Sequence, residues 1–533
     1  MMKKTIKKLL AALLAVAMLC AMAIPAFAYN PGETEEDLNT KHEYDAFQIF
    51  TGDVTGNEIK DFKISNVEWG SSIAHPNEFL AQLMADPTIG GNFETDFTAQ
   101  DVLAVISQWS TSDDYSIAFA RCVCNYVYSD GDSTPVIQGV HTGGVKVPKP
   151  GYYLIVDTSL FNEDDFYHAY NSFLLKVTKA EYVFPINYKV VKPTVEKKVY
   201  DNQDGTSEAG FYSSADHAIN EKFQFQLIAK LPASKDNGRA YDYYDKYTVC
   251  FNDTLSEGIT YDGLDSVVIE SNGTPYDITN DSSKYDIDIS NLKSQNSFVV
   301  KIHDVKNCVA NLNDGATITV TYTAHLNEKA YVNTVGGGTD NKNSVYLEYS
   351  NNPRISTSLD HTTTSEVCVY TYQLNNTKHQ DSENGPVLEG AGFRLYSNEA
   401  CNAEDEIKLK MNDDGTYSRD FSTEGKGVEM LSNKDGQFNV KGLDAGTYYL
   451  KETNPPAGYS ACPDKEIVIS ATHDVYNVSL AGNLSNKIIN KKAGGITLPS
   501  TGGIGTTLFY VVGGGLMVAA IVLLVTKKRM ENK

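Results

Sequence analysis

The sequence predicts an all-β protein. Short runs rich in Val, Ile, Tyr and Thr recur across residues 29–495, and apolar and polar side chains alternate along them, which is typical of half-buried strands. Turn dipeptides such as Asn272-Gly273 and Asp414-Gly415 separate the runs. The composition, with 33 Tyr, 40 Gly and 17 Pro, favours strands joined by turns over long helices.

The N-terminal segment predicts export. Four lysines precede an apolar run from Leu9 to Ile24, which ends at Ala26-Phe27-Ala28. A basic, an apolar and a small-residue region in this order form a secretory signal peptide. Cleavage is expected before Tyr29, so that residues 1–28 leave the mature protein.

The C-terminal segment predicts a membrane anchor. From Leu508 to Val525 the chain has 18 residues without a charge, and Lys527-Lys528-Arg529 follow. Such a stretch is long enough to cross a bilayer, and its basic flank belongs on the cytoplasmic side. A transmembrane helix and a basic tail are therefore expected within residues 496–533.

The net charge excludes one class of function. The chain carries −23, and without the signal (+4) and residues 502–533 (+3) the remainder carries −30. Nucleic-acid binding requires a basic surface that displaces counterions, so no nucleic-acid partner is expected. A self-repelling cell-surface ectodomain fits this charge. No cofactor or metal motif is found, and Gly-x-Ser-x-Gly and His-Glu-x-x-His are both missing from the sequence.

Three blocks lie between the two ends. We place the first block at 29–187, the middle block at 188–361 and the third block at 362–495. The strand pattern of the middle block breaks at Asn352-Pro353, and Gly494-Gly495 separates the third block from the C-terminal segment. Each block is long enough to form a domain of its own.

The first block contains the exceptions to the strand pattern. A short helix is expected within 97–107, where four apolar residues share one helical face. Cys122 and Cys124 are expected on a strand as small buried residues rather than metal ligands, because no second pair or nearby histidine accompanies them. Seven cysteines remain after signal removal, and an odd number cannot all form disulfides within the chain. Cys250 and Cys308 could form a disulfide with each other.

A five-residue motif precedes the predicted membrane span. It reads Leu498, Pro499, Ser500, Thr501, Gly502 and resembles the cell-wall sorting signal of Gram-positive surface proteins. The resemblance implies that a sortase cleaves between Thr501 and Gly502 and transfers the Thr501 carbonyl to an amine. The alternative is an ordinary single-pass anchor on a Pro/Gly stalk.

The third block contains a second motif. The run from Tyr448 to Tyr459 resembles the E-box of sortase-assembled pilins and of related collagen-adhesin B-type domains. Strand alternation puts Leu450 and Glu452 on the same face, so that the carboxylate points where apolar residues point. A carboxylate buried in this way is costly unless it is protonated or hydrogen-bonded.

Two further residues of the third block share this inward direction. The alternation of Tyr372 and Leu374 sends Lys378 inward, and Asn490 shares a face with Ile488. A desolvated lysine amine has a lowered pKa and becomes a neutral nucleophile, while a buried acid polarises an asparagine carbonyl and moves protons. An intramolecular amide between Lys378 and Asn490 is expected, with loss of ammonia. The alternative is a snorkelling lysine and a turn or capping acid.

The middle block offers a similar set. Lys197 alternates with Val195 and Val199, and Asp253 with Phe251. Asn343 begins the closing strand, and Asn341 has the same parity and is the alternative partner. The set resembles the middle domain of backbone pilins, in which an aspartate replaces the glutamate. A Lys197–Asn343 amide is expected here, whereas the first block has no lysine on its opening strand, residues 44–50, and no such bond is expected there.

The boundary of the first two blocks suggests a linking lysine. Polymerising pilins carry a Tyr-Pro-Lys-Asn type motif there, whose lysine accepts the threonine of the preceding subunit. This chain has Lys189, eight residues before Lys197, without a Pro-Lys pair. We favour Lys189 as the linking lysine, with Lys192 as the alternative. The remaining possibility is that Lys189 is a solvated lysine of the linker with no role in polymerisation.

Taken together, the chain resembles a backbone (major) subunit of a sortase-assembled pilus. The resemblance implies three tandem immunoglobulin-like β-sandwiches and a structural protein rather than an enzyme, apart from single-turnover bond formation in which Asp253 and Glu452 act as catalytic acids. It implies that the partners are pilin-specific and housekeeping sortases, other copies of the chain and peptidoglycan. It also implies that the protein is attached to the cell wall. Whether it binds a host or extracellular-matrix ligand stays open. The alternatives are a wall-anchored adhesin or accessory pilin that is not polymerised and, more remotely, an anchored hydrolase.

Overall fold

The computed structural model of the protein describes residues 43–55, 63–109, 114–141, 145–158, 172–177, 183–184, 192–202, 208–233, 244–309, 312, 315–333, 341–353, 355–422 and 425–493. The predicted signal peptide, Lys189, the motif at 498–502 and the predicted membrane span lie outside these residues. None of the helices in the described ranges combines the length and the apolar character needed to cross a membrane.

The chain divides into two compact units. Unit 1 comprises residues 1–373, 442–446 and 469–481, and unit 2 comprises residues 374–441, 447–468 and 482–533. The first and middle blocks thus lie in unit 1, and most of the third block lies in unit 2. The boundaries between the three blocks stay a prediction.

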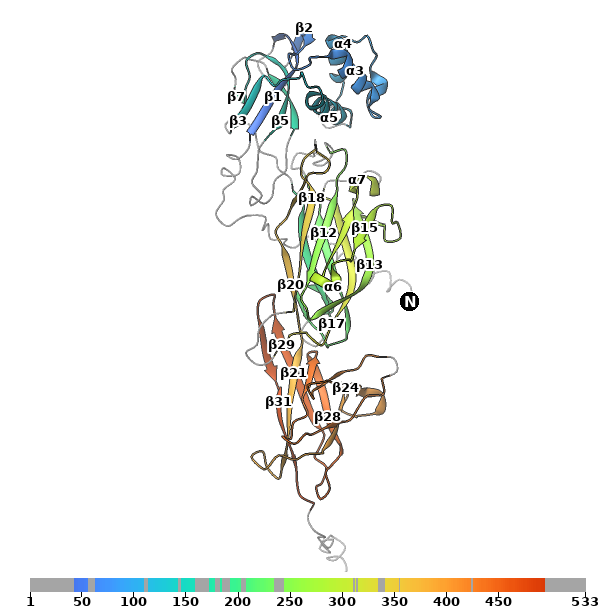
Figure 1. Ribbon diagram of the computed structural model, residues 1–533, viewed down its shortest axis with the longest axis vertical. Coiled ribbons are helices and arrows are strands. Elements are labelled where there is room, and N and C mark those ends of the chain that lie inside the picture. Colours follow the sequence, from blue (N-terminus) through green and yellow to red (C-terminus); the bar gives the residue numbers. More distant parts are fainter. Residues whose placement is uncertain are drawn as a thin grey trace, which may run out of the picture. The chain divides into compact units, whose positions relative to one another are not determined.

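The first block forms a sheet with helices beside it (Figure 1). Strand β1 is central in the order β2-β1-β5-β6, and β3 also pairs with β1. The elements are β1 (Glu43–Thr55), β2 (Lys63–Trp69), α3 (Pro76–Ala85), η2 (Gly90–Asn92), α4 (Ala99–Ile106), α5 (Asp114–Ser129), β3 (Ile137–His141), β4 (Val145–Lys146), β5 (Gly151–Asp157), β6 (Ser172–Val177) and β7 (Val183–Phe184).

The first half of β1 is buried on both faces. Phe47 and Ile49 of β1 belong to the apolar cluster that includes side chains of α3, α4 and α5. Tyr44 and Ala46 have the opposite parity and belong to a second cluster. A strand that is covered on both faces has an almost continuous run of apolar residues, as β1 does here.

The helix expected within 97–107 is confirmed as α4, whose Thr98 and Asp101 form a capping box. The strand expected around Cys122 and Cys124 was wrong, because both residues lie on α5. Helical spacing buries the α5 side chains against the sheet, and this packing overrides the strand propensity of the segment. The two cysteines are buried, as expected, and no disulfide joins Cys250 and Cys308, the pairing that the sequence left open.

The middle block is a sandwich of two sheets around one core. The sheet orders are β14-β13-β17-β11-β8-β9 and β10-β20-β18-β12-β16-β15, and β19 pairs with β18. Side chains from both sheets, such as Phe225 and Phe251, share one apolar cluster. The elements are β8 (Thr194–Asp201), β9 (Gly210–Tyr212), β10 (Ser214–Asp216), β11 (Lys222–Lys230), β12 (Val249–Leu255), β13 (Ile259–Ser271), β14 (Thr274–Asp277), β15 (Tyr285–Asp288), α6 (Leu292–Gln295), β16 (Ser297–Ile302), α7 (Val305–Cys308), β17 (Thr317–Leu326), β18 (Lys342–Ser350), β19 (Leu359–His361) and β20 (Ser365–Tyr370).

The third block also consists of two sheets. Their orders are β24-β25-β27-β21-β31 and β23-β22-β28-β29-β30, and β26 pairs with β22. The first strand, β21, runs parallel to the last, β31, and Lys378 is paired with Ile488. The elements are β21 (Tyr372–Gln380), β22 (Gly392–Tyr396), η3 (Ala403–Asp405), β23 (Glu406–Ile407), β24 (Leu409–Met411), β25 (Tyr417–Arg419), β26 (Met430–Leu431), β27 (Val440–Leu443), β28 (Gly446–Asn454), β29 (Lys465–His473), β30 (Val478–Gly482) and β31 (Ser485–Asn490).

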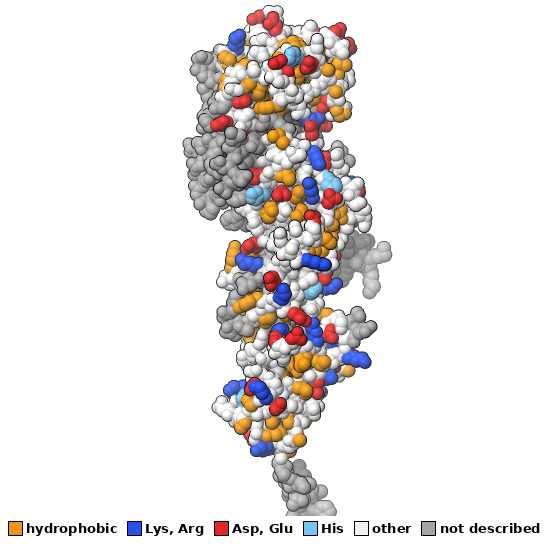
Figure 2. All heavy atoms as spheres, in the orientation of Figure 1, with side chains coloured by type: hydrophobic (Ala, Val, Ile, Leu, Met, Phe, Trp, Pro, Cys, Tyr) orange, Lys and Arg blue, Asp and Glu red, His pale blue; other side chains and the backbone are white. Residues whose placement is uncertain are grey.

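Strands dominate the described structure, which confirms the predicted all-β class. Figure 2 shows that acidic and basic side chains are interspersed over the visible face of the described residues. A mixed surface of this kind, with a net charge of −23 over the whole chain, favours solubility over phosphate binding.

Candidate functional site

In the third block, the three predicted residues lie inside the domain. Alternate side chains of β21 are buried, and Lys378 is fully buried among them. Glu452 follows Leu450 on the buried face of β28, and Asn490 is the last residue of β31. The exposed fraction is 0% for Lys378 and Asn490 and 7% for Glu452. Period-two alternation therefore places an amine, an acid and an amide in one interior.

The three side chains are in direct contact. Nζ of Lys378 donates to Oδ1 of Asn490 at 2.5 Å and lies 3.5 Å from Oε1 of Glu452. Nδ2 of Asn490 donates to the same Oε1 at 2.7 Å, and the backbone N–H of Cys462 donates to Oε2 at 2.7 Å. The carboxyl group thus touches both the amine and the amide that the amine would attack.

The surroundings of Lys378 are apolar on one side. Its Nζ lies 5.3 Å from the ring centroid of Phe393, which stacks on Phe438. Burial lowers the pKa of Lys378, although Cys462 and Glu452 oppose this change. Burial raises the pKa of the Cys462 thiol to about 11, so this thiol is protonated at neutral pH. A lowered amine pKa increases the neutral, nucleophilic fraction of Lys378.

In the middle block, Lys197 of β8 and Asp253 of β12 form a buried pair. Their exposed fractions are 2% and 1%, and Nζ of Lys197 is in direct contact with Oδ2 of Asp253. Lys198 points to the other face, and its side chain is 31% exposed, as the alternation predicts. The lysine and the acid come from different sheets of the sandwich.

The two candidate asparagines differ in what they contact. Asn341 is buried, but its side chain exchanges two hydrogen bonds with the backbone of Tyr331. Asn343 is fully buried, and its Nδ2 lies 2.5 Å from the hydroxyl oxygen of Tyr322. The same hydroxyl lies 3.2 Å from Nζ of Lys197. The geometry therefore favours Asn343 over Asn341 as the partner of Lys197.

Burial perturbs both members of the middle-block pair. It lowers the pKa of Lys197 to about 8, despite the opposing charge of Asp253. It raises the pKa of Asp253, despite the opposing effects of Lys197 and Tyr322. A low dielectric disfavours charge on either group, so burial favours the form with a neutral amine and a protonated acid relative to the same pair in water.

Two residues at these sites did not emerge from the sequence. Tyr322 lies on β17, and Cys462 lies in the segment between β28 and β29. The alternation of Ile318, Val320 and Tyr322 indicates burial of the tyrosine. It does not indicate which side chains of other strands the hydroxyl reaches.

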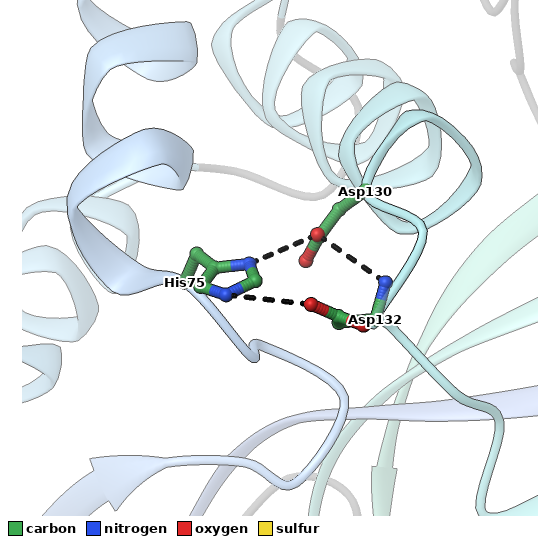
Figure 3. A group of neighbouring side chains, drawn as sticks. All are labelled: His75, Asp130 and Asp132. Atoms are coloured by element: carbon green, nitrogen blue, oxygen red, sulfur yellow. Dashed lines mark hydrogen bonds and ion pairs between the residues drawn. The ribbon is translucent and has the colours of Figure 1, made fainter.

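One group of described residues that could hold a metal ion lies in the first block (Figure 3). Nδ1 of His75 is 3.0 Å from Oδ1 of Asp130, and Nε2 is 3.6 Å from Oδ2 of Asp132. The hydrogen bond from Tyr126 is the largest of the effects that lower the pKa of Asp130 to about 2, and Asp130 in turn raises the pKa of His75. This ion pair joins the residue before α3 to the end of α5, which is a structural role.

Two further groups of this kind lie in unit 1. One contains Asp201, Asp216 and His473, and the other contains His217, Glu221 and Asp444. Burial, reinforced by the neighbouring Asp216, raises the pKa of Asp444 well above its usual range. A protonated carboxyl group at Asp444 reduces the repulsion within this acidic cluster.

The comparisons with protein families match two parts of the chain. Residues 374–483 match a prealbumin-like fold domain, and residues 490–532 match the LPXTG cell wall anchor motif. The first match contains Lys378 and Glu452. The second match contains the motif at 498–502 and supports its interpretation as a cell-wall anchor, which makes this a surface protein of the Gram-positive type.

Several solved structures are similar to this chain. The T6 backbone pilin of serotype M6 Streptococcus pyogenes is 17% identical, with a TM-score of 0.47 over 85% of this chain and 97% of that chain. The full-length major pilin SpaD from Corynebacterium diphtheriae is 18% identical, with a TM-score of 0.40 over 89% and 95%. A C-terminal fragment of the major pilin GBS80 of Streptococcus agalactiae is 20% identical, with a TM-score of 0.40 over 56% and 99%. No curated protein matches the sequence.

Proposed function

We propose that this chain is a structural subunit of a cell-surface pilus, which a sortase polymerises head to tail. We further propose that intramolecular Lys–Asn amides stabilise it, so that it performs only single-turnover chemistry on itself. The observation that carries the proposal is the contact of Lys378, Glu452 and Asn490 in a buried interior. Lys378 and Glu452 lie within the match to a prealbumin-like domain, and Asn490 is the first residue of the match to the cell-wall anchor motif.

The third-block reaction balances without any added reagent. Neutral Nζ of Lys378 attacks Cγ of Asn490, and Glu452 moves the protons, since its Oε1 accepts from Nδ2 of Asn490 and lies 3.5 Å from Nζ. One proton leaves Nζ and one reaches Nδ2, with Glu452 as the carrier. The Cγ–Nδ2 bond breaks and ammonia departs, and an amide joins the two side chains. Exclusion of water strengthens each of these interactions.

The proposed bonds suit a protein that bears tension. In the third block the amide would join the first strand β21 to the last strand β31, which are neighbours in one sheet. In the middle block it would join β8 of one sheet to β18 of the other. Noncovalent contacts of a marginally stable domain yield slowly under a continuous pull, whereas a covalent link between strands prevents their separation.

Polymerisation would use two further positions. Cleavage after Thr501 leaves an acyl group that the linking lysine of the next copy accepts, Lys189 in our assignment and Lys192 in the alternative. Lys192 is half-buried at the start of the described middle block. Because donor and acceptor are different surfaces of the same chain, the link is heterologous and does not close, and it therefore builds a filament.

The test of this function is an intact-mass measurement on the recombinant chain 29–495. The mass should fall short of the sequence mass by two ammonia molecules, and tryptic maps should lack free Lys197 and Lys378. Surface protein from cells should run as an SDS-resistant ladder. A full sequence mass would contradict the bonds, and a single band would favour a non-polymerised adhesin or accessory pilin.

The rate of bond formation in the middle block should have a bell-shaped dependence on pH, with a maximum between an acidic and a basic limb. The reactive state is the pair of Lys197 and Asp253 with one shared proton, as the neutral amine and the neutral acid. As the pH rises through about 8, to which burial lowers the pKa of Lys197, the pair loses this proton and the acid can no longer donate. At low pH the amine is charged, and the rate should fall again. Acid-quenched time courses at each pH, read by intact mass, would show this, and a rate that still rises above pH 9 would contradict it.

A further inference from the structure

The two proposed reaction centres differ in how the acid reaches the asparagine. In the third block, Oε1 of Glu452 accepts directly from Nδ2 of Asn490 at 2.7 Å. In the middle block the acid is an aspartate, which is one methylene shorter. Within the described residues, Asp253 makes no hydrogen bond to Asn343. In the middle block, another group therefore has to contact Nδ2 of Asn343, as the oxygen of Glu452 contacts Nδ2 of Asn490 in the third block.

The hydroxyl of Tyr322 occupies this position. It lies 2.5 Å from Nδ2 of Asn343 and donates to Oδ1 of Asp253 at 3.1 Å. The other oxygen of Asp253 contacts Nζ of Lys197. A continuous path of polar atoms thus runs from the amide nitrogen that leaves, through Tyr322 and Asp253, to the amine that attacks.

Packing holds this hydroxyl in place. Tyr322 lies on β17, which is flanked by β13 and β11, and the side chain is fully buried. Its ring packs on Phe225 at 5.2 Å and edge-on against Phe298 at 5.0 Å between centroids. Burial raises the pKa of Tyr322 well above its usual range, so the phenol remains protonated and can both donate and accept a hydrogen bond.

We propose that Tyr322 is a catalytic residue of the middle-block crosslink, which passes a proton from Asp253 to the leaving nitrogen of Asn343. This inference rests on the proposed function. Nζ of Lys197 attacks Cγ of Asn343. Tyr322 gives its hydroxyl proton to Nδ2 and takes the proton of Asp253, the Cγ–Nδ2 bond breaks, and ammonia leaves. Asp253 then takes the proton that Nζ loses, so the acid and the phenol both return to their starting forms.

The experiment compares Tyr322→Phe with the unchanged chain. The chain 29–495 is made by cell-free synthesis and quenched in acid at intervals, and intact mass with peptide mapping gives the rate of each bond. Tyr322→Phe should slow the Lys197–Asn343 bond by at least about 100-fold, since general acid–base catalysis contributes that much or more. The Lys378–Asn490 bond of the same molecules should form at its normal rate and is the internal reference.

A matched control removes a hydroxyl from the same aromatic cluster. Tyr261 packs on Tyr322 at 5.6 Å between centroids, and Tyr261→Phe should leave both rates unchanged. A middle-block rate in Tyr322→Phe equal to that of the unchanged chain would overturn the role of Tyr322 and leave the proposed function intact. If the unchanged chain itself loses no ammonia, the proposed function fails, and the role of Tyr322 fails with it.

A second variant covers the case in which Tyr322→Phe does not fold, as judged by rapid tryptic digestion of the middle block. Incorporation of 3-fluorotyrosine at position 322 alone keeps the ring and the hydroxyl but makes the phenol more acidic. The rate of the middle-block bond should then change several-fold relative to the third-block bond. An unchanged ratio of the two rates would overturn the proposal.

Discussion

In a Glu452→Gln chain, the amide between Lys378 and Asn490 is expected to form far more slowly than in the unchanged chain. Glutamine preserves the shape of Glu452 but cannot carry a proton between the amine and the leaving nitrogen. In the proposed reaction this carboxyl group carries the proton, since it lies 2.7 Å from Nδ2 of Asn490 and 3.5 Å from Nζ of Lys378. We expect the rate to fall by about 10²- to 10⁴-fold. Intact mass should then show one ammonia more than the unchanged chain.

The same variant should lose stability. The two linked residues are 112 positions apart, and closing a loop of that length restricts the unfolded chain by about 5 kcal/mol on the chain-entropy estimate for crosslinks. For a domain of this size that corresponds to a melting temperature lower by roughly 20 °C. Differential scanning calorimetry of the chain 29–495 would measure the change.

Glu466→Gln is the matched control for this prediction. Glu466 is an exposed residue on the neighbouring strand β29, so its replacement should change neither the mass deficit nor the melting temperature. Normal bond formation in Glu452→Gln would contradict the assigned role of the acid. So would a loss of stability no larger than that of the control.

The second large effect is expected from the linking lysine. Lys189→Ala should abolish the SDS-resistant ladder in cells that carry the cognate sortase and leave only monomer attached to the wall. The physical reason is that the acyl group on Thr501 then lacks the amine of the next copy. Immunoblots of detergent-treated cell-wall extracts would show the change.

Lys192→Ala provides the control, because this alternative lysine is three residues away on the same connection. It should leave the ladder intact. Loss of the ladder in Lys192→Ala, with a normal ladder in Lys189→Ala, would transfer the linking role to Lys192. A normal ladder in the double variant would exclude both lysines.

Strand parity was sufficient to predict which side chains point inward. Lys197 and Lys378 alternate with apolar neighbours, and both are buried in the structure, as are Asp253 and Glu452. The prediction succeeds because residues i and i+2 of a strand point to the same face of the sheet. An apolar, buried residue therefore indicates that the side chain two positions away is also directed inward. The match of residues 490–532 to an anchor motif supports the interpretation of the C-terminal motif in the same way.

The helices of the first block could be predicted only in part. The segment of α4 has a helix period and a capping box, both of which are local features. The segment of α5 is rich in residues that favour strands, and it is helical because its buried side chains pack against the sheet. Local propensity is a weak determinant when tertiary packing opposes it.

The sequence by itself determined the all-β class, the anchor motif and the inward direction of the lysines and acids, because each of these follows from residues adjacent in the chain. Only the tertiary structure shows that the hydroxyl of Tyr322 contacts both Lys197 and Asn343, whereas the side chain of Asn341 bonds to the backbone of Tyr331. These contacts join strands of two different sheets. Their distances depend on how the sheets pack, which no local pattern records.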